Sequence, residues 1–252
     1  MTRFSYTSDH PDEKPATIGL VVLQADETLE HDFQRLMPPE KIIQHVTRLP
    51  SDSTVSHDGL AAMQQSLASA VGLFPQATQF DVVGFGCTSG ASIIGASNIA
   101  KLITSNCTTA NVTDPLSALI AACGMLKLKN LAVLSPYVKE VSDALRASLQ
   151  QAGINSPVFG SFEEHREEKV VGIDRKSILN AAIQLGSSPQ VDAIFLSCTN
   201  LKTLDVIADI EAKILKPVLS SNQVLAWHIC KLAGIELKHR NKGHLLSGQT
   251  TT

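Results

Sequence analysis

Residues 82–89 read VVGFGCTS and residues 193–200 read AIFLSCTN. Each stretch is an apolar run that ends in Cys-Thr, and the two cysteines, Cys87 and Cys198, lie 111 positions apart (198 minus 87). We expect each run to form a buried strand that carries a thiol at its carboxyl end, just before a helix. Ligands of open α/β sheets bind at that edge of the sheet. The repeat therefore predicts two similar halves, with a cleft that places one sulfur on each face of a substrate.

Outward from these two runs, apolar strand patterns alternate with helical patterns along the chain. Such alternation is typical of an α/β fold whose parallel sheets are covered by helices on both faces. We expect an N-terminal lobe from residues 15–125 plus 217–252, a C-terminal lobe from 126–216, and a tail, 1–14, that frays. The expected strands are 17–23, 42–49, 81–85, 131–135, 192–197 and 216–220, and the expected helices are 59–72, 90–102, 115–126, 138–152, 177–185, 204–215 and 223–232. Periodicity does not decide between a strand and a loop at 170–173, and the charge run 163–169 indicates a solvated loop or helix end.

The composition of the chain limits which binding partners and which cellular compartment are expected. The chain has 252 residues, of which 44% are hydrophobic, enough for a sizeable core in one large domain or two small ones. Its formal net charge of −3 argues against nucleic acid or an anionic membrane as the main partner. No apolar run approaches the roughly 18 residues that span a bilayer, and the N-terminus lacks the pattern of a secretion signal. We therefore expect a cytoplasmic protein.

The motifs of several other enzyme classes are missing. The five cysteines are odd in number and include no C-x-x-C pair, so reduced thiols are expected rather than disulfides or a zinc site. Gly84-x-Gly86 follows a strand like a dinucleotide-binding loop, but Ser89 stands where that motif needs its third glycine. There is no H-x-x-x-H pair and no G-x-S-x-G. The chemistry predicted from the two thiols needs no metal and no cofactor.

Cys87 and Cys198 are the candidate catalytic groups. Glycines around Cys87 permit close approach of main-chain N–H groups, and the positive end of the following helix faces the same place. Both features lower a thiol pKa and favour the reactive thiolate. Two such thiols suit acid–base chemistry in which one takes a proton and the other gives one. The alternative for either cysteine alone is simple packing at the end of a strand.

Polar side chains surround the two thiols and form the candidate substrate-binding set. Hydroxyl, amide and main-chain N–H groups next to the cysteines are suited to hold a carboxylate and an enolate-like charge, although the same residue types also cap helices. Tyr137 ends a strand and is either a site residue or a rim aromatic. Asp26 follows the first strand and either faces the cleft or caps the next helix. The complete set is Asp26, Thr88, Ser89, Tyr137, Thr199 and Asn200.

Six short motifs, taken in order, make the chain similar to the aspartate/glutamate racemase superfamily. It resembles most the branch of maleate cis–trans isomerases and arylmalonate decarboxylases, and it is also similar to superfamily members associated with ectoine breakdown. The resemblance covers most of the chain after the N-terminal tail. The motifs are Asp26 to Glu30, Gly86 to Ser89, Ser135 to Tyr137, Ser197 to Leu201, Lys216 to Val218 and Gly243 to Gly248.

The resemblance implies two Rossmann-like (flavodoxin-like) lobes related by a pseudo-twofold axis, with a cofactor-free site between them. It matches Cys87 and Cys198 to the paired cysteines of the family. It matches Thr88, Ser89, Tyr137 and Thr199 to groups that hold a substrate carboxylate, and it implies a homo-oligomer, a dimer or larger. Decarboxylase members of this branch keep only the second cysteine, so the presence of both favours isomerisation or racemisation.

Asp26 departs from the pattern of the maleate isomerases, which carry an Asn at this position. An ionised Asp repels a second substrate carboxylate and attracts an ammonium group. We therefore expect a substrate that carries an amine or amide rather than a plain dicarboxylate.

The sequence thus predicts a cofactor-independent racemase or isomerase that acts on a small amino-acid-like or maleate-like carboxylate. One alternative is a decarboxylase of the arylmalonate type. Another is a non-catalytic small-molecule binding protein, because two α/β lobes with a cleft also serve as sensors. Thiol reactivity separates the enzyme from the sensor, since an enzyme needs at least one thiol that ionises in use.

Overall fold

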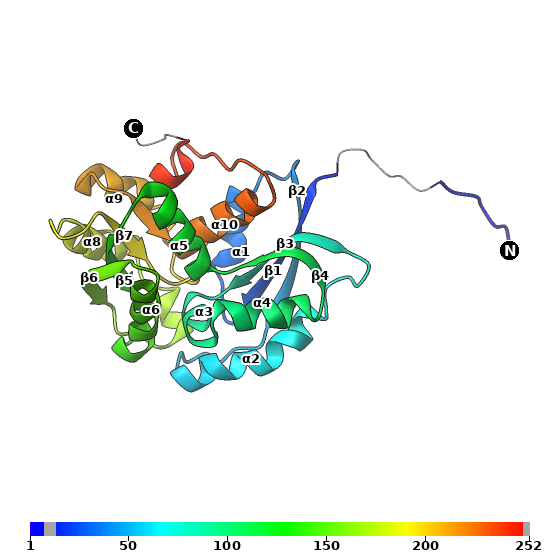
Figure 1. Ribbon diagram of the computed structural model, residues 1–252, viewed down its shortest axis with the longest axis horizontal. Coiled ribbons are helices and arrows are strands. Elements are labelled where there is room, and N and C mark those ends of the chain that lie inside the picture. The colour runs from blue at the N-terminus through cyan, green and yellow to red at the C-terminus, as the bar shows by residue number, and fades with distance from the viewer. Residues whose placement is uncertain (8–13, 249–252) are drawn as a thin grey trace.

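Two lobes, each built on a four-stranded parallel sheet, make up the protein (Figure 1). The computed structural model describes residues 1–7 and 14–248. The strand order is β2-β1-β3-β4 in the first sheet and β6-β5-β7-β8 in the second. The two orders are the same if β5 is matched to β1, β6 to β2, β7 to β3 and β8 to β4. This match confirms the two-lobed α/β fold expected from the repeated cysteine pattern.

The first lobe contains nine elements. Its central strands are apolar on both faces because helices cover both sides of a parallel sheet. In β1 the last six residues are all buried. The elements are β1 (Ala16–Leu23), α1 (Leu29–Leu36), β2 (Ile42–Leu49), α2 (His57–Val71), β3 (Gln79–Gly86), α3 (Thr88–Ile94), α4 (Ala96–Thr104), β4 (Thr108–Thr113) and α5 (Pro115–Leu126).

The second lobe repeats the alternation of strand and helix. Strand β7 is buried along its whole length and pairs in parallel with both β5 and β8. The elements are β5 (Asn130–Ser135), α6 (Lys139–Gln151), β6 (Asn155–Ser161), α7 (Glu167–Val170), α8 (Arg175–Gly186), β7 (Ala193–Leu196), α9 (Ile207–Ile214), β8 (Val218–Ser220), α10 (Ser221–Leu232) and the 3₁₀ turn η1 (His244–Leu246).

The chain crosses between the lobes one element later than expected. Strand β8 pairs with β7 and belongs to the second sheet, so the expected return to the first lobe at residue 217 is wrong for this strand. Helix α10 then packs against α1, α5 and β3 of the first lobe (Figure 1). The junction between β8 and α10 therefore lies between the two sheets.

Other differences from the expected elements have local causes. The expected helix 90–102 is two helices, because Gly95 adopts φ +84°, a left-handed conformation that interrupts the helix. Strands β4 and β6 were not expected, α1 was expected only as the helix that follows Asp26, and residues 170–173 are the end of α7 and a turn. Of the predicted tail, residues 8–13 lie outside the described part of the chain, and residues 1–7 form no helix or strand.

Candidate active site

Cys87 and Cys198 line one small closed cavity at the carboxyl ends of β3 and β7. Both side chains are buried, with 6% and 2% of their surface exposed. All eight residues predicted for the site line this cavity, and two further residues, Leu23 and Glu167, complete it. The lining residues are Leu23, Asp26, Cys87, Thr88, Ser89, Tyr137, Glu167, Cys198, Thr199 and Asn200.

Cys87 is the N-cap residue of α3, and its sulfur accepts a hydrogen bond from the Gly90 N–H at 3.2 Å. A Cβ at Gly90 would lie 3.1 Å from that sulfur, so glycine makes room for the thiol. Gly84 and Gly86 of β3 allow neighbouring side chains to pack closely, which is a different role from the close approach of a ligand. A Cβ at Gly86 would overlap the Leu29 side chain and lie 2.8 Å from the Val21 carbonyl oxygen.

Cys198 is held in an unusual backbone conformation with φ +119°. A non-glycine residue in this region is strained by about 1–3 kcal/mol and needs surrounding contacts to hold it. The Cys198 N–H donates to Ser221 Oγ at 3.0 Å, and its sulfur accepts from the Asn200 N–H at 3.3 Å. The strain therefore fixes the direction of the thiol toward the cavity.

Ser221, the first residue of α10, connects the two cysteine loops. Its Oγ accepts from the Thr88 hydroxyl at 2.7 Å as well as from the Cys198 N–H. The Thr199 hydroxyl bonds across the lobes in the same way, to the Gly86 carbonyl oxygen at 3.3 Å. The two threonine hydroxyls are thus engaged in joining the lobes, so their main-chain groups are the better candidates for substrate contacts.

Glu167 is the site residue that the sequence analysis missed. It was placed in the solvated charge run 163–169, but the structure leaves only 5% of it exposed. Its Oε1 accepts from the Tyr137 hydroxyl at 2.9 Å, and its Oε2 accepts from Asn200 Nδ2 at 2.7 Å. The available signal was Val170, three residues on, because a helical turn places both side chains on the same buried face.

Tyr137 connects this carboxylate to the second thiol. Its hydroxyl oxygen lies 3.0 Å from Cys198 Sγ while the hydroxyl donates to Glu167. Asn200 fixes the other side of Glu167 and accepts from the Glu27 N–H at 2.9 Å through Oδ1. Tyr137 and Asn200 therefore both line the cavity and contact the same carboxylate.

Asp26 lines the cavity, and its side chain also bonds to the start of α1, where Thr28 is the N-cap residue. Its Oδ1 accepts from the N–H groups of Thr28 and Leu29, each at 2.8 Å. Burial raises the pKa of Asp26 above its usual value, although the Leu29 N–H, the Thr199 side chain and Arg48 favour the ionised form. Arg48 itself donates to the Asp26 carbonyl oxygen at 2.8 Å.

Both thiols are hard to ionise because they are buried. Burial raises the pKa of Cys87 to about 12, against a smaller lowering by the Gly90 N–H. Burial followed by the nearby Glu167 raises the pKa of Cys198 well above its usual value. The expectation of a lowered thiol pKa is therefore wrong for these thiols, because desolvation outweighs the helix end and the N–H groups.

Comparison with known proteins identifies the family. The family model described as arylmalonate decarboxylase matches residues 19–246. The chain belongs to the arylmalonate decarboxylase family. The maleate isomerase of Nocardia farcinica is 25% identical over 240 residues, covering 91% of this chain and 94% of that protein. The arylmalonate decarboxylase of Bordetella bronchiseptica is 25% identical over 235 residues, which cover 89% of this chain and 93% of that protein.

Solved structures of the family share the fold of this chain. The maleate isomerase Iso from Pseudomonas putida S16 has a TM-score of 0.84 at 22% identity, covering 93% of this chain and 99% of that one. A second structure is a cysteine-to-serine mutant of the Nocardia farcinica maleate cis–trans isomerase with a covalently bound succinylcysteine intermediate. Its TM-score is 0.81 at 23% identity, and the match covers 94% of this chain and 100% of that one. These matches confirm the resemblance to the maleate isomerase and arylmalonate decarboxylase branch.

In this family member, two segments from different lobes cover the cavity. The Val55 N–H donates to the His165 carbonyl oxygen at 2.7 Å, and the Glu167 N–H donates to the Ser53 carbonyl oxygen at 2.9 Å. An adjoining hollow, which shares Cys87, Tyr137 and Glu167 with the cavity, lies under this cover. Its further lining includes the apolar side chains of Val55, Leu60 and Met63.

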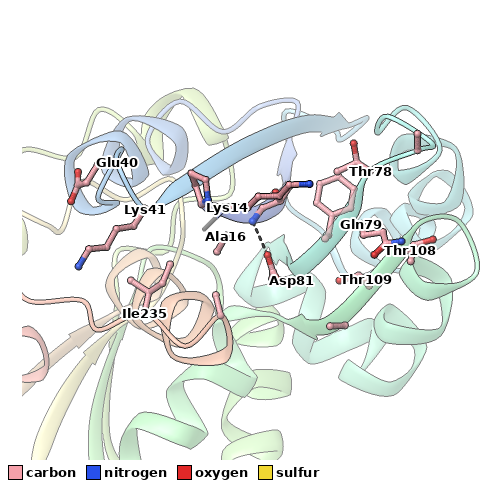
Figure 2. A pocket seen from close by; sticks show the side chains of 16 residues that line it. Lys14, Ala16, Glu40, Lys41, Thr78, Gln79, Asp81, Thr108, Thr109 and Ile235 are labelled. Atoms are coloured by element: carbon pink, nitrogen blue, oxygen red, sulfur yellow. Dashed lines mark hydrogen bonds between the residues drawn. The ribbon is translucent and has the colours of Figure 1, made fainter. Parts of the chain in front are cut away.

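A wider hollow lies at the opposite edge of the first sheet, where β1, β3 and β4 begin (Figure 2). Lys14, Glu40, Lys41 and Asp81 lie around it, and Asp81 accepts a hydrogen bond from the Thr17 N–H at 2.7 Å. Neither cysteine of the closed cavity reaches it. The substrate site of an open α/β sheet lies at the carboxyl ends of the strands, so this hollow is not the candidate active site.

The structure describes residues 1–7 and 14–248, and two findings concern that part of the chain. No group of three or more His, Cys, Asp or Glu side chains there is arranged to hold a metal ion. None of the helices in that part of the chain has the length and apolar character needed to cross a membrane.

Proposed function

We propose that this protein is a cofactor-independent isomerase or racemase that acts on a small carboxylate through Cys87 and Cys198. The observation that carries the proposal is the placement of two thiols, one from each lobe, in a single closed cavity. The covalent succinylcysteine in the Nocardia farcinica relative supports a cysteine as a reacting group in this fold.

In the racemase form, one thiolate removes the α-proton of the substrate and the electron pair moves into an enediolate. The other thiol then donates its proton to the opposite face of the α-carbon, which leaves the first cysteine protonated and the second ionised. Main-chain groups beside Thr88, Ser89 and Thr199 stabilise the carboxylate charge during this step.

In the isomerase form, the Cys87 thiolate adds to one carbon of a C=C bond while Cys198 gives its proton to the other. The former double bond is now single and rotates. Cys198 then recovers the proton, the C=C bond re-forms and the Cys87 thiolate leaves. In either form no electron is gained or lost overall, so the chemistry needs no redox partner.

A second candidate function is decarboxylation, which the matching family model favours. In that reaction the bond to a carboxylate carbon breaks, carbon dioxide leaves and a thiol protonates the remaining carbanion. We rank it below isomerisation because both cysteines are present and both line the cavity.

Proton NMR in deuterium oxide tests the proposal with a panel of small amino acids, N-acyl diamino acids, maleate and aryl malonates. Cys87→Ala and Cys198→Ala are compared with Cys123→Ala, a buried cysteine of α5 that does not line the cavity. The expected result is deuterium at an α-carbon, or conversion of maleate to fumarate, that is lost in the first two variants and kept in the third. Carbon dioxide release identifies the decarboxylase. A ligand that binds without any conversion identifies the sensor and refutes the proposal.

The predicted homo-oligomer and the cytoplasmic location remain predictions. Size-exclusion chromatography with light scattering measures the first.

A further inference from the structure

The cavity carries two buried carboxylates and no cationic side chain among its lining residues. Asp26 and Glu167 are 4% and 5% exposed. The other lining residues are thiols, hydroxyls, an amide and one leucine. Arg48, which lowers the pKa of Asp26, is exposed and does not line the cavity. A substrate therefore meets two acids and no basic side chain among the residues that line the cavity.

Asp26 has an oxygen that points to a missing partner. Its Oδ1 accepts from the N–H groups of Thr28 and Leu29, and these bonds fix the plane of the carboxylate. Its Oδ2 is buried and has no partner that meets hydrogen-bond geometry within the described residues, although the Thr199 side chain also stabilises the ionised carboxylate. Buried polar atoms are nearly always paired, so an unpaired carboxylate oxygen that lines a cavity indicates a donor brought by the ligand.

Glu167 places a second carboxylate in the same cavity. The hydroxyl of Tyr137 and the amide of Asn200 each donate to one of its oxygens. Each carboxylate oxygen has two acceptor positions, so both oxygens keep capacity for a ligand. Burial raises the pKa of Glu167, and the nearby Asp26 adds a smaller contribution in the same direction, so Asp26 lies close enough to oppose ionisation of Glu167.

We propose that Asp26 and Glu167 form a subsite for a substrate amino group, so that the substrate is a small amino acid or amino-acid derivative. This inference rests on the proposed function, since it assigns the substrate class of the same cavity. An ammonium group supplies the donors that Asp26 Oδ2 lacks and neutralises two like charges. A plain dicarboxylate adds negative charge to a site that already holds two acids.

The same subsite explains how thiols with raised pKa values enter the reaction. Glu167 and Asp26 contribute to the raised pKa of both Cys87 and Cys198. A bound ammonium group cancels part of that negative field and so lowers both thiol pKa values. Substrate binding would then favour the thiolate form of the nucleophile.

Isothermal titration calorimetry with matched ligands tests the subsite without requiring turnover. The probes are 2-aminobutyrate and asparagine in both enantiomers, their amine-free counterparts butyrate and succinamate, and maleate. For wild type we expect at least one amine-bearing probe to bind at least tenfold more tightly than its counterpart. In Asp26→Asn/Glu167→Gln this preference falls to near one, and maleate binding tightens at least tenfold.

The controls change exposed acids next to each subsite residue. Glu27→Gln and Glu168→Gln remove the same charge from the surface and are expected to keep the wild-type preference. If the double variant does not fold, Asp26→Asn alone is used. Asn keeps an oxygen for the Thr28 and Leu29 N–H groups, and this variant is expected to lose part of the preference.

The two proposals fail in different ways. Equal binding of the amine-bearing and amine-free probes, or no binding of any amine-bearing probe at millimolar concentration, overturns the subsite even if the enzyme isomerises maleate. An amine preference that depends on Asp26 and Glu167, found without any conversion of substrate, supports the subsite and overturns the proposed chemistry.

Discussion

Ser221→Ala tests whether the junction between β8 and α10 holds the two cysteine loops in place. The Ser221 oxygen is fully buried and accepts from the Cys198 N–H at 3.0 Å and from the Thr88 hydroxyl at 2.7 Å. Alanine removes both acceptor bonds at once. The Thr88 hydroxyl is free to rotate toward another acceptor, but the Cys198 N–H is fixed by the backbone.

The expected loss of stability follows from these two bonds. A buried donor left unpaired costs about 1–3 kcal/mol, and the net loss of a satisfied hydrogen bond about 1 kcal/mol. We therefore expect Ser221→Ala to lower the free energy of unfolding by about 2–4 kcal/mol. Relaxation of the strained Cys198 backbone also misplaces the thiol, and a shift of about 1 Å at a reacting group costs on the order of 100-fold in rate.

Denaturant unfolding and kcat/KM on the substrate found by NMR measure the two effects. Ser220→Ala is the matched control, because Ser220 is equally buried but caps α10 through the Gln223 N–H without touching either cysteine loop. Ser220→Ala should lower the free energy of unfolding by about 1 kcal/mol and leave kcat/KM within severalfold of wild type. The reasoning is refuted if Ser221→Ala is no less stable than Ser220→Ala and retains full kcat/KM.

Three further predictions follow from the cavity and its surroundings. Glu167→Gln should lower the pKa of Cys87, because it removes a nearby acid that raises this pKa. Iodoacetamide should then alkylate Cys87 faster at pH 8, by about tenfold for each unit by which the pKa falls. An unchanged alkylation rate contradicts the role given to Glu167. Gly86→Ala should lower the free energy of unfolding by about 1–3 kcal/mol or more, because the added carbon meets a main-chain oxygen. Gly84→Ala should lower it less in the same denaturant assay, because there the added carbon meets only a side-chain methyl group. Burial raises the pKa of Asp32 from 3.8 to about 6, so between these pH values the folded state holds a proton that the unfolded state releases. The stabilisation from this bound proton is complete below pH 3.8 and is lost as pH rises through about 6. Asp32→Asn should therefore gain up to about 3 kcal/mol over wild type between pH 4 and pH 7, and a stability difference that does not change with pH contradicts the assignment.

The repeated strand-and-thiol pattern predicted the site because it follows from local sequence. A run of buried residues that ends in Cys-Thr fixes both the strand and the edge at which its thiol emerges. The two sheets with matching strand orders then bring Cys87 and Cys198 into one cavity. The polar residues next to each thiol were predicted for the same reason, since they share its loop.

Residues that reach the cavity from elsewhere carried no comparable signal. Glu167 lies in a run of charges, and it is buried by tertiary contacts: its segment bonds to Ser53 and Val55 of the other lobe, and its carboxylate bonds to Tyr137 and Asn200. Ser221 reads as an ordinary helix start, and its role depends on which lobe α10 joins. The thiol pKa values were predicted in the wrong direction because the closed cover, which desolvates both sulfurs, is a tertiary feature.

Each lobe supplies one thiol to the cavity, and the residues after the first strand of each lobe make the surroundings of the two thiols different. That position supplies Asp26 in the first lobe and Tyr137 in the second. Tyr137 has one proton to donate, and it donates it to Glu167. Its oxygen, 3.0 Å from Cys198 Sγ, must then accept the Cys198 proton while Glu167 is ionised.

This hydrogen-bond direction assigns the roles of the two cysteines in the proposed chemistry. Cys198 is held as a thiol that donates a proton, whereas Cys87 accepts from the Gly90 N–H and faces the start of α3, an arrangement that favours the thiolate once the opposing charges are neutralised. An ammonium group between Asp26 and Glu167 keeps Glu167 ionised and removes the field that opposes ionisation of Cys87. The substrate amino group would therefore set both protonation states that the reaction needs, which connects the choice of substrate to the order of proton transfer.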